Sequence, residues 1–418
     1  WRGPGGPPPT DISLFFSPQP LTMLRGSPSN TSFFNESTSP SDETVFDFSN
    51  QDLSSGSSFR HLLRIVEEPE DATKFGACKM DLSSTKFASS ADFNVLLSAL
   101  CKNTSVEELN LSTNHMCSSD FISETNGSSL RELLQSNSTL RKLDLAGHCL
   151  SREAVLELTQ GLKSNSSLTD LRLHNCALDE ESVSLVLEHG KRLTTLDIGA
   201  NKNLSLDFLT SNVTQFLRTS TSLRSLILDQ SSSMFAATEA TILTPFWEVL
   251  ETNTTLQSLS LRSCRLCDPV GEALMEALTK NETLVKLDLE FSGFGLKEPS
   301  KQALVRLLPR MKGLRELKMI TRFPANMTPS LLQAVKDNTS LRVFRPLVSD
   351  KAQHNLIQGI LERNLRNSQA EMVAPADGRA LLATAVLAPA LSCLGHNTYG
   401  VPAAHKVLLH YISECVLS

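Results

Sequence analysis

A recurring leucine pattern constrains the fold of this chain more than any other feature. The template is Leu-x-x-Leu-x-Leu-x-x-(Asn/Cys)-x-Leu, and it returns through most of the 418 residues. Close copies begin at Leu140, Leu168, Leu256 and Leu284, and a copy with conservative replacements begins at Val106. Looser copies begin at Leu193, Leu223, Leu314 and Leu341, and a degenerate one begins near Phe75. The unit of roughly 28 residues predicts a solenoid in which each repeat packs mainly on its neighbours.

Amphipathic stretches lie between the leucine templates. Residues 151–165 and 268–281 carry apolar side chains at helical spacing. Ser151 and Asp268 stand at their starts, where a side-chain oxygen caps the first backbone N–H groups. Each unit is therefore predicted to run strand, turn, helix, turn.

These motifs together resemble one class of repeat protein. A repeat near this length, with a full helix and with Cys or Asn at the ninth template position, is similar to the ribonuclease-inhibitor-like leucine-rich repeats over about residues 70–350. The resemblance implies an α/β leucine-rich-repeat solenoid, a horseshoe with parallel concave strands and convex helices. Members include ribonuclease inhibitors, the Ran GTPase-activating protein and the sensor halves of nucleotide-binding immune receptors, so the fold alone does not name a partner.

Composition divides the chain into three regions. Residues 1–58 are rich in Pro, Ser and Gly and are predicted to be a disordered tail. Residues 59–350 form the predicted repeat domain. Residues 351–418 lose the template and are predicted to form a helical C-terminal cap over the open end of the solenoid, with a small interaction module as the alternative.

Charge and cysteine content narrow the compartment and the partner. A net charge of −6 gives no electrostatic footprint for nucleic acid or an anionic membrane. The nine cysteines are odd in number and scattered, which favours reduced thiols in the cytoplasm or nucleus. No apolar run reaches the length of a membrane helix. Because the chain starts at Trp1, we expect the natural N-terminus to be missing, and a secreted protein stays an alternative.

Asparagine recurs three positions before the first leucine of the templates. The residues at this position are Asn103, Asn137, Asn165, Gly190, Ser220, Asn253, Asn281, Met311 and Asn338. All six asparagines begin N-glycosylation acceptor patterns. The exchange with Gly190 favours a backbone explanation, in which the helix ends with a left-handed residue that Gly or Asn adopts readily. The acceptor patterns then follow from repeat geometry and do not by themselves indicate secretion.

No catalytic, cofactor or metal motif emerges from the sequence. It lacks a phosphate-binding loop, a His-Glu-x-x-His metal motif and a Gly-x-Ser-x-Gly nucleophile motif. Cys264 and Cys267 have the spacing of half a zinc site, but no second pair matches it, and Cys264 occupies a template position. We therefore expect no enzyme activity, no cofactor and no metal.

A partner is expected to bind where strand side chains alternate with the core leucines, on the concave face. Asp144, Asp170, Asp197 and Asp229 fall on four successive strands, with Arg172 and His174 among them. At about 4.8 Å between strands, they predict a patch suited to a basic loop or helix. A second, mixed group follows from the later strands. The full set of predicted partner-binding residues is Asp144, Asp170, Arg172, His174, Asp197, Asp229, Arg262, Lys286, Asp288, Glu290 and Lys318.

The sequence thus leaves three functions open. The first is a non-catalytic scaffold that binds an unidentified protein, and neither nucleic acid nor membrane, through the concave face. The alternatives are a regulator of a small GTPase, by analogy with the Ran activator, and a glycosylated extracellular recognition domain. Because the concave face lacks Trp and Tyr, we expect modest or regulated affinity.

Overall fold

A computed structural model of the chain describes residues 44–67, 78–113, 124–237 and 239–373. All of them belong to the second of two structural units, Glu43–Ser418, the first being Trp1–Asp42. The parts of the predicted N-terminal tail and C-terminal cap at residues 1–43 and 374–418 lie outside the described residues.

Strands and helices alternate along this unit. The first half contains β1 Thr44–Asp47, α1 Gly56–Glu67, β2 Cys78–Asp81, α2 Ser90–Leu100, β3 Val106–Asn110, α3 Glu124–Ser136, β4 Lys142–Asp144, α4 Arg152–Ser164, β5 Asp170–Arg172, α5 Glu180–His189, β6 Thr195–Asp197, α6 Leu206–Phe208, η1 Leu209–Val213 and α7 Thr214–Thr219. The second half contains β7 Ser225–Ile227, η2 Ala240–Leu243, α8 Thr244–Thr252, β8 Ser258–Ser260, α9 Asp268–Leu278, β9 Lys286–Asp288, α10 Glu298–Leu307, η3 Leu308–Arg310, β10 Glu316–Lys318, β11 Arg322–Phe323, α11 Thr328–Asp337, β12 Val343–Phe344, β13 Leu347–Val348 and α12 Lys351–Val373.

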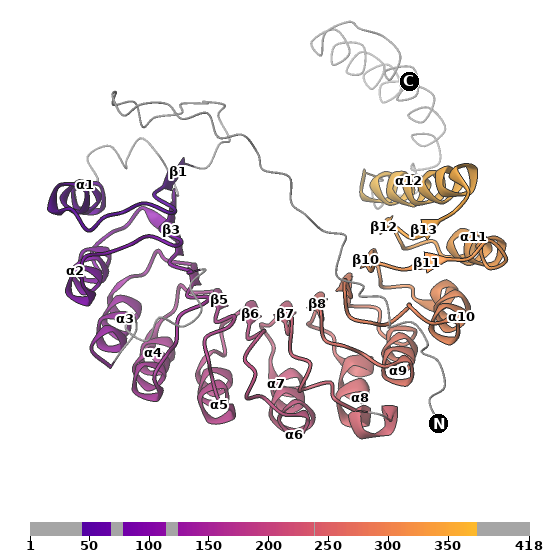
Figure 1. Ribbon diagram of the computed structural model, residues 1–418, viewed down its shortest axis with the longest axis horizontal. Helices are drawn as coiled ribbons and strands as arrows, with labels where there is room; N and C mark the ends of the chain where they lie inside the picture. Colours follow the sequence, from indigo (N-terminus) through magenta and orange to yellow (C-terminus); the bar gives the residue numbers. More distant parts are fainter. Residues whose placement is uncertain (1–43, 68–77, 114–123, 238, 374–418) are drawn as a thin grey trace, which may run out of the picture. The chain divides into compact units, whose positions relative to one another are not determined.

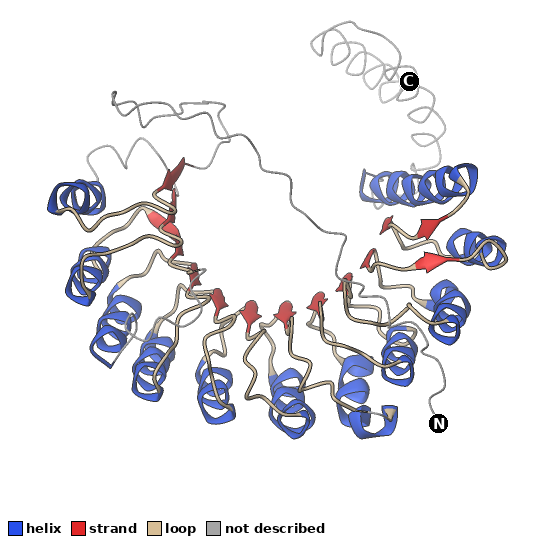
Figure 2. Cartoon of the chain, in the orientation of Figure 1, coloured by secondary structure: helices blue, strands red, loops and turns tan. Residues whose placement is uncertain are grey.

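The strands form one parallel layer and the helices the other, as the leucine template predicted. Eleven strands, β1 to β10 and then β12, pair in sequence order, and β11 pairs with β13 in a small separate sheet. Figures 1 and 2 show the described repeats of this unit following an arc, with strands inside and helices outside. This is a leucine-rich-repeat solenoid.

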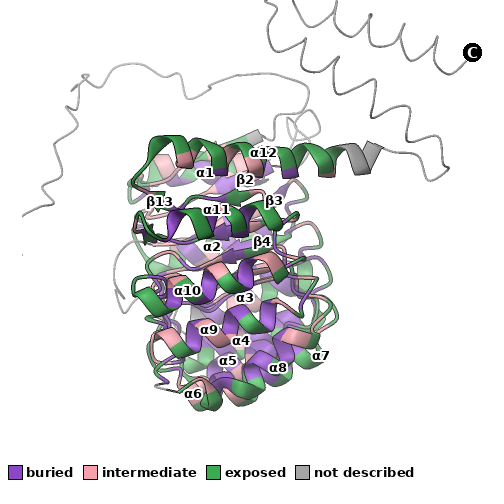
Figure 3. Ribbon diagram, turned by 90° about the vertical axis from the view of Figure 1, so that its right-hand side faces the viewer, coloured by how far each residue is buried: buried purple, intermediate pink, exposed green. Residues whose placement is uncertain are grey.

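The core is a stack of aligned leucines between these two layers. Leu143, Leu171 and Leu196 are register partners on β4, β5 and β6, and each is at most 1% exposed. The same column continues through Leu226, Leu259, Leu287 and Leu317. In Figure 3 buried residues recur along the ribbon of successive helices, alternating with exposed ones. Burying one such leucine contributes about 1.5–3 kcal/mol, so each repeat is stabilised mainly by stacking on the next.

The repeat array begins earlier than the sequence predicted. Strand β1 pairs in parallel with β2, and α1 starts at Gly56, so both elements reach into the segment predicted as a disordered tail. Phe46 and Phe48 take the places of two template leucines, and Leu53 is buried. The prediction was wrong for residues 44–58 because phenylalanines surrounded by Ser and Asn conceal the leucine pattern.

The recurring asparagines do not end the helices in the left-handed conformation. Asn165, Asn253 and Asn338 have φ values of −70°, −68° and −80°, and none of the six asparagines has a positive φ. The left-handed residues lie instead in the turn three residues after the last residue of most strands. They include Asn50, Ser84, Gly147, Asn175, Ala200, Gln230, Ser263 and Phe291. The sequence prediction placed the backbone requirement at the wrong turn.

The asparagines are selected by hydrogen bonding between repeats. The Oδ1 atom of Asn137 accepts from the backbone N–H groups of Thr139 and Leu140, at 2.9 and 2.7 Å. Its Nδ2 donates to the carbonyl oxygens of Leu100 and Asn103 in the preceding repeat, at 2.8 and 2.9 Å. We call this pattern the asparagine ladder. Equivalent bonds to the preceding repeat start from Asn103, Asn165, Asn253, Asn281 and Asn338, and Asn364 of α12 donates to Asn338 and Leu341.

The asparagine ladder also provides hydrogen-bond donors for the backbone carbonyl groups at the ends of helices. Carbonyl groups in the last turn of a helix have no partner within the helix, and Asn165 Nδ2 reaches the carbonyl of Leu134 in α3 at 2.6 Å. Asn103, Asn137, Asn165, Asn281 and Asn338 are at most 7% exposed. A glycan on Nδ2 would remove one of these donors and would require space that the fold fills. The acceptor patterns at these positions are therefore a by-product of the ladder.

Candidate functional site: the concave strand face

The strand register sets out the concave side chains in columns. The central column contains Asp47, Asp81, Asn110, Asp144, Arg172, Asp197, Ile227, Ser260, Asp288 and Lys318. The column before it contains Lys79, Glu108, Lys142, Asp170, Thr195, Ser225, Ser258, Lys286 and Glu316. Both columns follow the order expected from the sequence, and acidic groups outnumber basic ones in the central column and equal them in the column before it.

Most acidic and amide residues of the central column have a structural task. Oδ1 of Asp144 accepts the backbone N–H of Ala146 at 2.9 Å, and Asp197 and Asp288 accept the N–H groups of Gly199 and Glu290 at 2.9 and 3.0 Å. Asp47, Asp81 and Asn110 do the same for Ser49, Ser83 and Ser112. An Asx side chain that bonds two residues ahead forms a turn, so one oxygen of each aspartate closes the end of its own strand.

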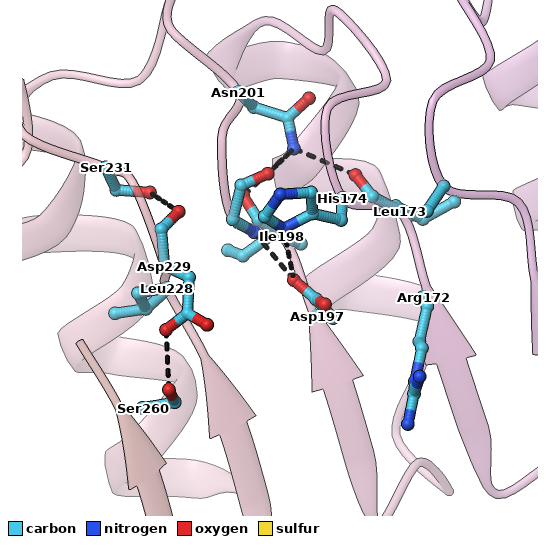
Figure 4. A network of polar contacts seen from close by, with 12 residues as sticks. Arg172, Leu173, His174, Asp197, Ile198, Asn201, Leu228, Asp229, Ser231 and Ser260 are labelled. Carbon is cyan, nitrogen blue, oxygen red and sulfur yellow. Dashed lines mark hydrogen bonds and ion pairs between the residues drawn. The ribbon is translucent and has the colours of Figure 1, made fainter. Parts of the chain in front are cut away.

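His174, which follows β5, contacts Asp197, one of the aspartates that close their own strand ends (Figure 4). Nδ1 of His174 lies 3.4 Å from Oδ1 of Asp197, and Asp197 is 8% exposed. Gly199 leaves room for the imidazole, since a Cβ there would lie 2.8 Å from Nδ1. The hydrogen bond with Asp197 raises the pKa of His174 above its usual value, helped by the nearby carboxylates of Asp229 and Asp144 and opposed by burial.

Asp229 supports the neighbouring strand end rather than its own. Its Oδ1 accepts the hydroxyl of Ser260 at 2.5 Å and the backbone N–H of Arg262 at 3.0 Å. Ser260 stands where other repeats have aspartate, so Asp229 supplies the missing carboxylate across the strands (Figure 4). Burial raises the pKa of Asp229 above its usual value, and hydrogen bonds from Ser260 and Arg262 oppose that rise.

The remaining predicted residues form ion pairs with their neighbours. Arg172 Nη1 lies 3.5 Å from Asp144 Oδ2, and burial raises the pKa of Asp144. In the second group, Arg262 Nη1 lies 2.7 Å from Glu290 and 3.4 Å from Asp288. A further set of contacts joins Lys286 and Lys318 to Glu316, at 3.8 and 3.3 Å. Neighbouring charges therefore offset one another along much of the face.

The four aspartates of the first predicted patch do not form one column. Asp144 and Asp197 lie in the central column, Asp170 lies in the column before it, and Asp229 follows β7. Asp170 is half-buried, and its Oδ2 accepts only the Thr169 hydroxyl, at 2.7 Å, among the contacts that the structure describes. Asp170 is thus better placed to meet a partner than Asp197, whose carboxylate serves the fold.

No protein-family model matches the chain. It is 30% identical over 285 residues to capping protein, Arp2/3 and myosin-I linker protein 3 of Rattus norvegicus, a match that covers 66% of this chain and 20% of the relative. It is 27% identical over 191 residues to centrosomal protein of 78 kDa of Mus musculus, covering 38% of this chain and 23% of that protein. The chain therefore spans about a fifth of the length of the curated relatives it matches.

Among solved structures, the yeast complex of Rad7 and Elc1 contains a similar chain. The likeness has a TM-score of 0.48 at 21% identity and covers 70% of this chain and 68% of that one. The tropomodulin C-terminal domain of Caenorhabditis elegans is similar with a TM-score of 0.33 at 16% identity, over 39% of this chain and 98% of that one.

Three exposed apolar side chains in the segments that follow β9 and β10 were missed from the sequence. Phe291 is 64% exposed, Leu296 63% and Ile320 42%. The arginine side chain of Arg262 places its guanidinium carbon 6.0 Å from the centre of the Phe291 ring. The available signal was the residue type at the left-handed turn position, which is small or polar in most repeats but phenylalanine here.

We expect His174→Gln to change the pH dependence of stability. A histidine whose pKa is higher in the folded state than in the unfolded state stabilises the folded state. This contribution is complete below the unfolded pKa of about 6.5, and it is lost as the pH rises through the folded pKa. The loss of unfolding free energy in His174→Gln should therefore be larger at about pH 5.5 than at about pH 8.5. The charged groups around His174 are Asp144, Asp197 and Asp229, and all remain in the variant.

Urea unfolding of both proteins at the two pH values, followed by circular dichroism, measures this difference. His61, which is exposed on α1, provides the matched control His61→Gln. A His174→Gln effect that is the same at both pH values would contradict the coupling to Asp197.

Within the part of the chain that is described, no three His, Cys, Asp or Glu residues are grouped to hold a metal, and no helix could span a membrane.

Proposed function

We propose that this chain is a non-catalytic protein-interaction scaffold of the ribonuclease-inhibitor-like leucine-rich-repeat class, which binds a basic segment of a partner on its concave strands. One observation carries the proposal. The strand layer presents ordered columns of charged side chains with an acidic excess, while helices cover its other side. A partner that presents lysine or arginine complements such a face, because opposed potentials steer association and fix register.

The name of one relative supplies candidate partners. The name of the Rattus norvegicus relative couples capping protein, the Arp2/3 complex and myosin-I. We propose one of these three as the binding partner of this chain. Measuring the binding of the wild-type chain to each of the three tests this proposal directly.

We also propose a reducing compartment, the cytoplasm or nucleus, as the place of action. In the described residues Cys78, Cys101, Cys149, Cys176, Cys264 and Cys267 are all free thiols. Burial raises the pKa of Cys264 to about 12, which keeps this thiol protonated and unreactive. The asparagine ladder likewise favours a chain whose acceptor patterns carry no glycan.

The test is the double charge reversal Asp170→Lys and Glu290→Lys. Both side chains are half-buried on the concave side and belong to the predicted binding set, and neither closes its own strand end. Asp197 is left intact because its carboxylate bonds Gly199 and His174. We expect binding to whichever of the three proteins associates with the wild-type chain to weaken about tenfold, with a slower association rate and a weaker salt dependence.

The matched control is Asp207→Lys with Glu248→Lys. These residues are exposed on α6 and α8, on the helical side, and the substitutions change the net charge by the same amount. Surface plasmon resonance at two salt concentrations gives the rates. Equal weakening by both double variants would mean that net charge alone matters, and that the concave face is not the binding site.

A further inference from the structure

The left-handed turn after β9 carries the most exposed large apolar side chain of the described residues. Phe291 has a φ of 57°, a backbone conformation that bulky side chains adopt at a steric disadvantage. Other repeats use Asn50, Gly147, Asn175, Ala200 and Ser263 at this turn position. The ring is 64% exposed, so burial in the core does not compensate for the disadvantage. Neither the backbone nor the core accounts for phenylalanine here.

The loop that carries Phe291 is held firmly in place. Phe294, three residues later, is 2% exposed and packs on Gly271, where a Cβ would lie 2.0 Å from its ring. The carbonyl of Ser292 accepts from Leu266 N at 2.6 Å, and Gly295 donates its N–H to Ser300 Oγ at 3.1 Å. One aromatic side chain anchors the loop inward, and the other is presented outward in a fixed position.

The neighbouring repeat extends the apolar surface. Lys318 is the register partner of Asp288, so Ile320, two residues after it, lies beside the end of β9. Ile320 is 42% exposed. The hydroxyl of Thr321 donates to the carbonyl of Gly295 at 2.6 Å. Because Gly295 directly precedes the exposed Leu296, this bond holds the Leu296 segment against the repeat of β10. Phe291, Leu296 and Ile320 are thus exposed apolar side chains on two neighbouring repeats, and exposed apolar surface of this kind indicates an interaction site.

The charges around Phe291 indicate what the partner should carry. Arg262 lies beside the ring and is already paired with Asp288 and Glu290. Asp229 adds a further carboxylate through its bond to the Arg262 backbone. In this part of the face the four carboxylates of Asp229, Asp288, Glu290 and Glu316 exceed the three cations of Arg262, Lys286 and Lys318 by one. An apolar side chain from the partner fits Phe291 and Ile320, and a neighbouring lysine or arginine fits the carboxylates.

We propose that Phe291 and Ile320, flanked by Leu296, form an apolar anchor site for a partner segment in which an apolar side chain is followed or preceded closely by a lysine or arginine. This inference rests on the proposed function and deepens it, because it names the chemistry of the segment. A buried aromatic or aliphatic anchor surrounded by paired charges is the usual source of affinity in an interface, and this site supplies the anchor that Trp and Tyr do not.

A peptide selection tests this site with the full chain. A phage-displayed library of random twelve-residue peptides is selected on the wild-type chain, and the enriched peptides are synthesised. Their affinities are then measured for wild type, Phe291→Asn, the Asp170→Lys/Glu290→Lys double variant and Leu347→Asn. Leu347 is 55% exposed on β13 and is the control for losing an exposed leucine. Asn stands at the same turn position in two other repeats, so we expect Phe291→Asn to melt at the wild-type temperature or above.

The expected result is enrichment of peptides with an apolar residue within a few positions of Lys or Arg. Their affinity should fall at least tenfold for Phe291→Asn and stay unchanged for Leu347→Asn. Basic peptides that bind wild type and Phe291→Asn equally, but lose affinity for the double charge variant, would overturn the anchor site and leave the proposed function standing. Peptides without Lys or Arg would overturn both.

Sedimentation velocity of wild type and Phe291→Asn tests the remaining alternative, in which a second copy of the chain binds at Phe291. We expect both proteins to sediment identically at all concentrations. A wild-type dimer that the Phe291→Asn variant does not form would overturn the proposal, because Phe291 would then join two copies of this chain rather than bind a partner segment.

Discussion

Asn137→Gly is expected to destabilise the chain by roughly 3–5 kcal/mol, because it leaves buried backbone groups on two repeats without partners. The Asn137 side chain bonds the N–H groups of Thr139 and Leu140 and the carbonyls of Leu100 and Asn103. Glycine is the informative substitution, since a left-handed helix end would accept it without loss. The asparagine ladder, in contrast, requires the amide itself. Urea denaturation followed by circular dichroism measures the change.

Asn212→Ala provides the control for this substitution. Asn212 also begins a glycosylation acceptor pattern, but it is exposed, and its Nδ2 contacts only the Ser184 hydroxyl, at 3.0 Å, among the bonds described. We expect its removal to change stability by at most about 0.5 kcal/mol. If Asn137→Gly were as mild as Asn212→Ala, hydrogen bonding could not be the reason for asparagine at this position.

Gly147→Ala is expected to cost roughly 3–5 kcal/mol, since an overpacked side chain is added to a left-handed backbone. Gly147 has a φ of 84°, and a Cβ on it would lie 2.0 Å from the carbonyl oxygen of Thr113. That oxygen belongs to the backbone of the adjacent repeat, so it cannot turn away as a flexible side chain would. The thermal midpoint of unfolding, read by circular dichroism, should fall by several degrees.

Ala200→Gly separates the two causes of this effect. Ala200 occupies the same turn position with a φ of 56°, so the left-handed conformation alone is compatible with a methyl group. We expect Ala200→Gly to change stability by less than about 1 kcal/mol in either direction. A loss as large as that of Gly147→Ala would show that the contact with Thr113 is not decisive.

The leucine template allowed the fold to be predicted because packing acts on residue type at fixed spacing. Leu143, Leu171 and Leu196 must all face the core if each strand contributes alternate side chains, so the concave columns follow directly. The members of these columns can be deduced without knowledge of any particular contact. It also places Asp170 and Arg172 on the outward side of β5, where the structure has them.

The roles of the polar residues could not be predicted in the same way. Asparagine satisfies both a left-handed turn and a hydrogen-bond ladder, and only the positions of Leu100 and Asn103 relative to Asn137 distinguish the two. Asp197 likewise has the sequence signature of an exposed acid, yet its carboxylate accepts from Gly199 and contacts His174. A sequence pattern says which face a side chain is on, but not whether its atoms are already occupied.

For Phe291 and Phe294, in contrast to these polar residues, the leucine template separates the exposed side chain from the buried one. Their sequence context, Phe-Ser-Gly-Phe-Gly, contains two phenylalanines, and the template copy that begins at Leu284 places Phe294, not Phe291, at its last core position. The structure buries Phe294 against Gly271 and leaves Phe291 outside. Residue 291 has the left-handed backbone that occurs at the turn after most of the described strands.

The asparagine ladder has a mechanical consequence for a solenoid. Each amide joins two repeats, so a repeat that opens removes hydrogen bonds from its neighbour as well as from itself, and opening spreads along the array. Gly190 and Ser220 lack this side-chain amide at two successive repeats, where Ser220 Oγ accepts the N–H of Leu223 in its own turn, and Met311 lacks it at a later repeat. Other side chains cross between the repeats at β6 and β7: Asn201 Oδ1 accepts the N–H groups of Cys176 and Leu178, both at 3.0 Å, and the Ser222 hydroxyl donates to the Leu193 carbonyl at 2.9 Å. Opening should therefore spread through these repeats by a different set of bonds rather than stop at them.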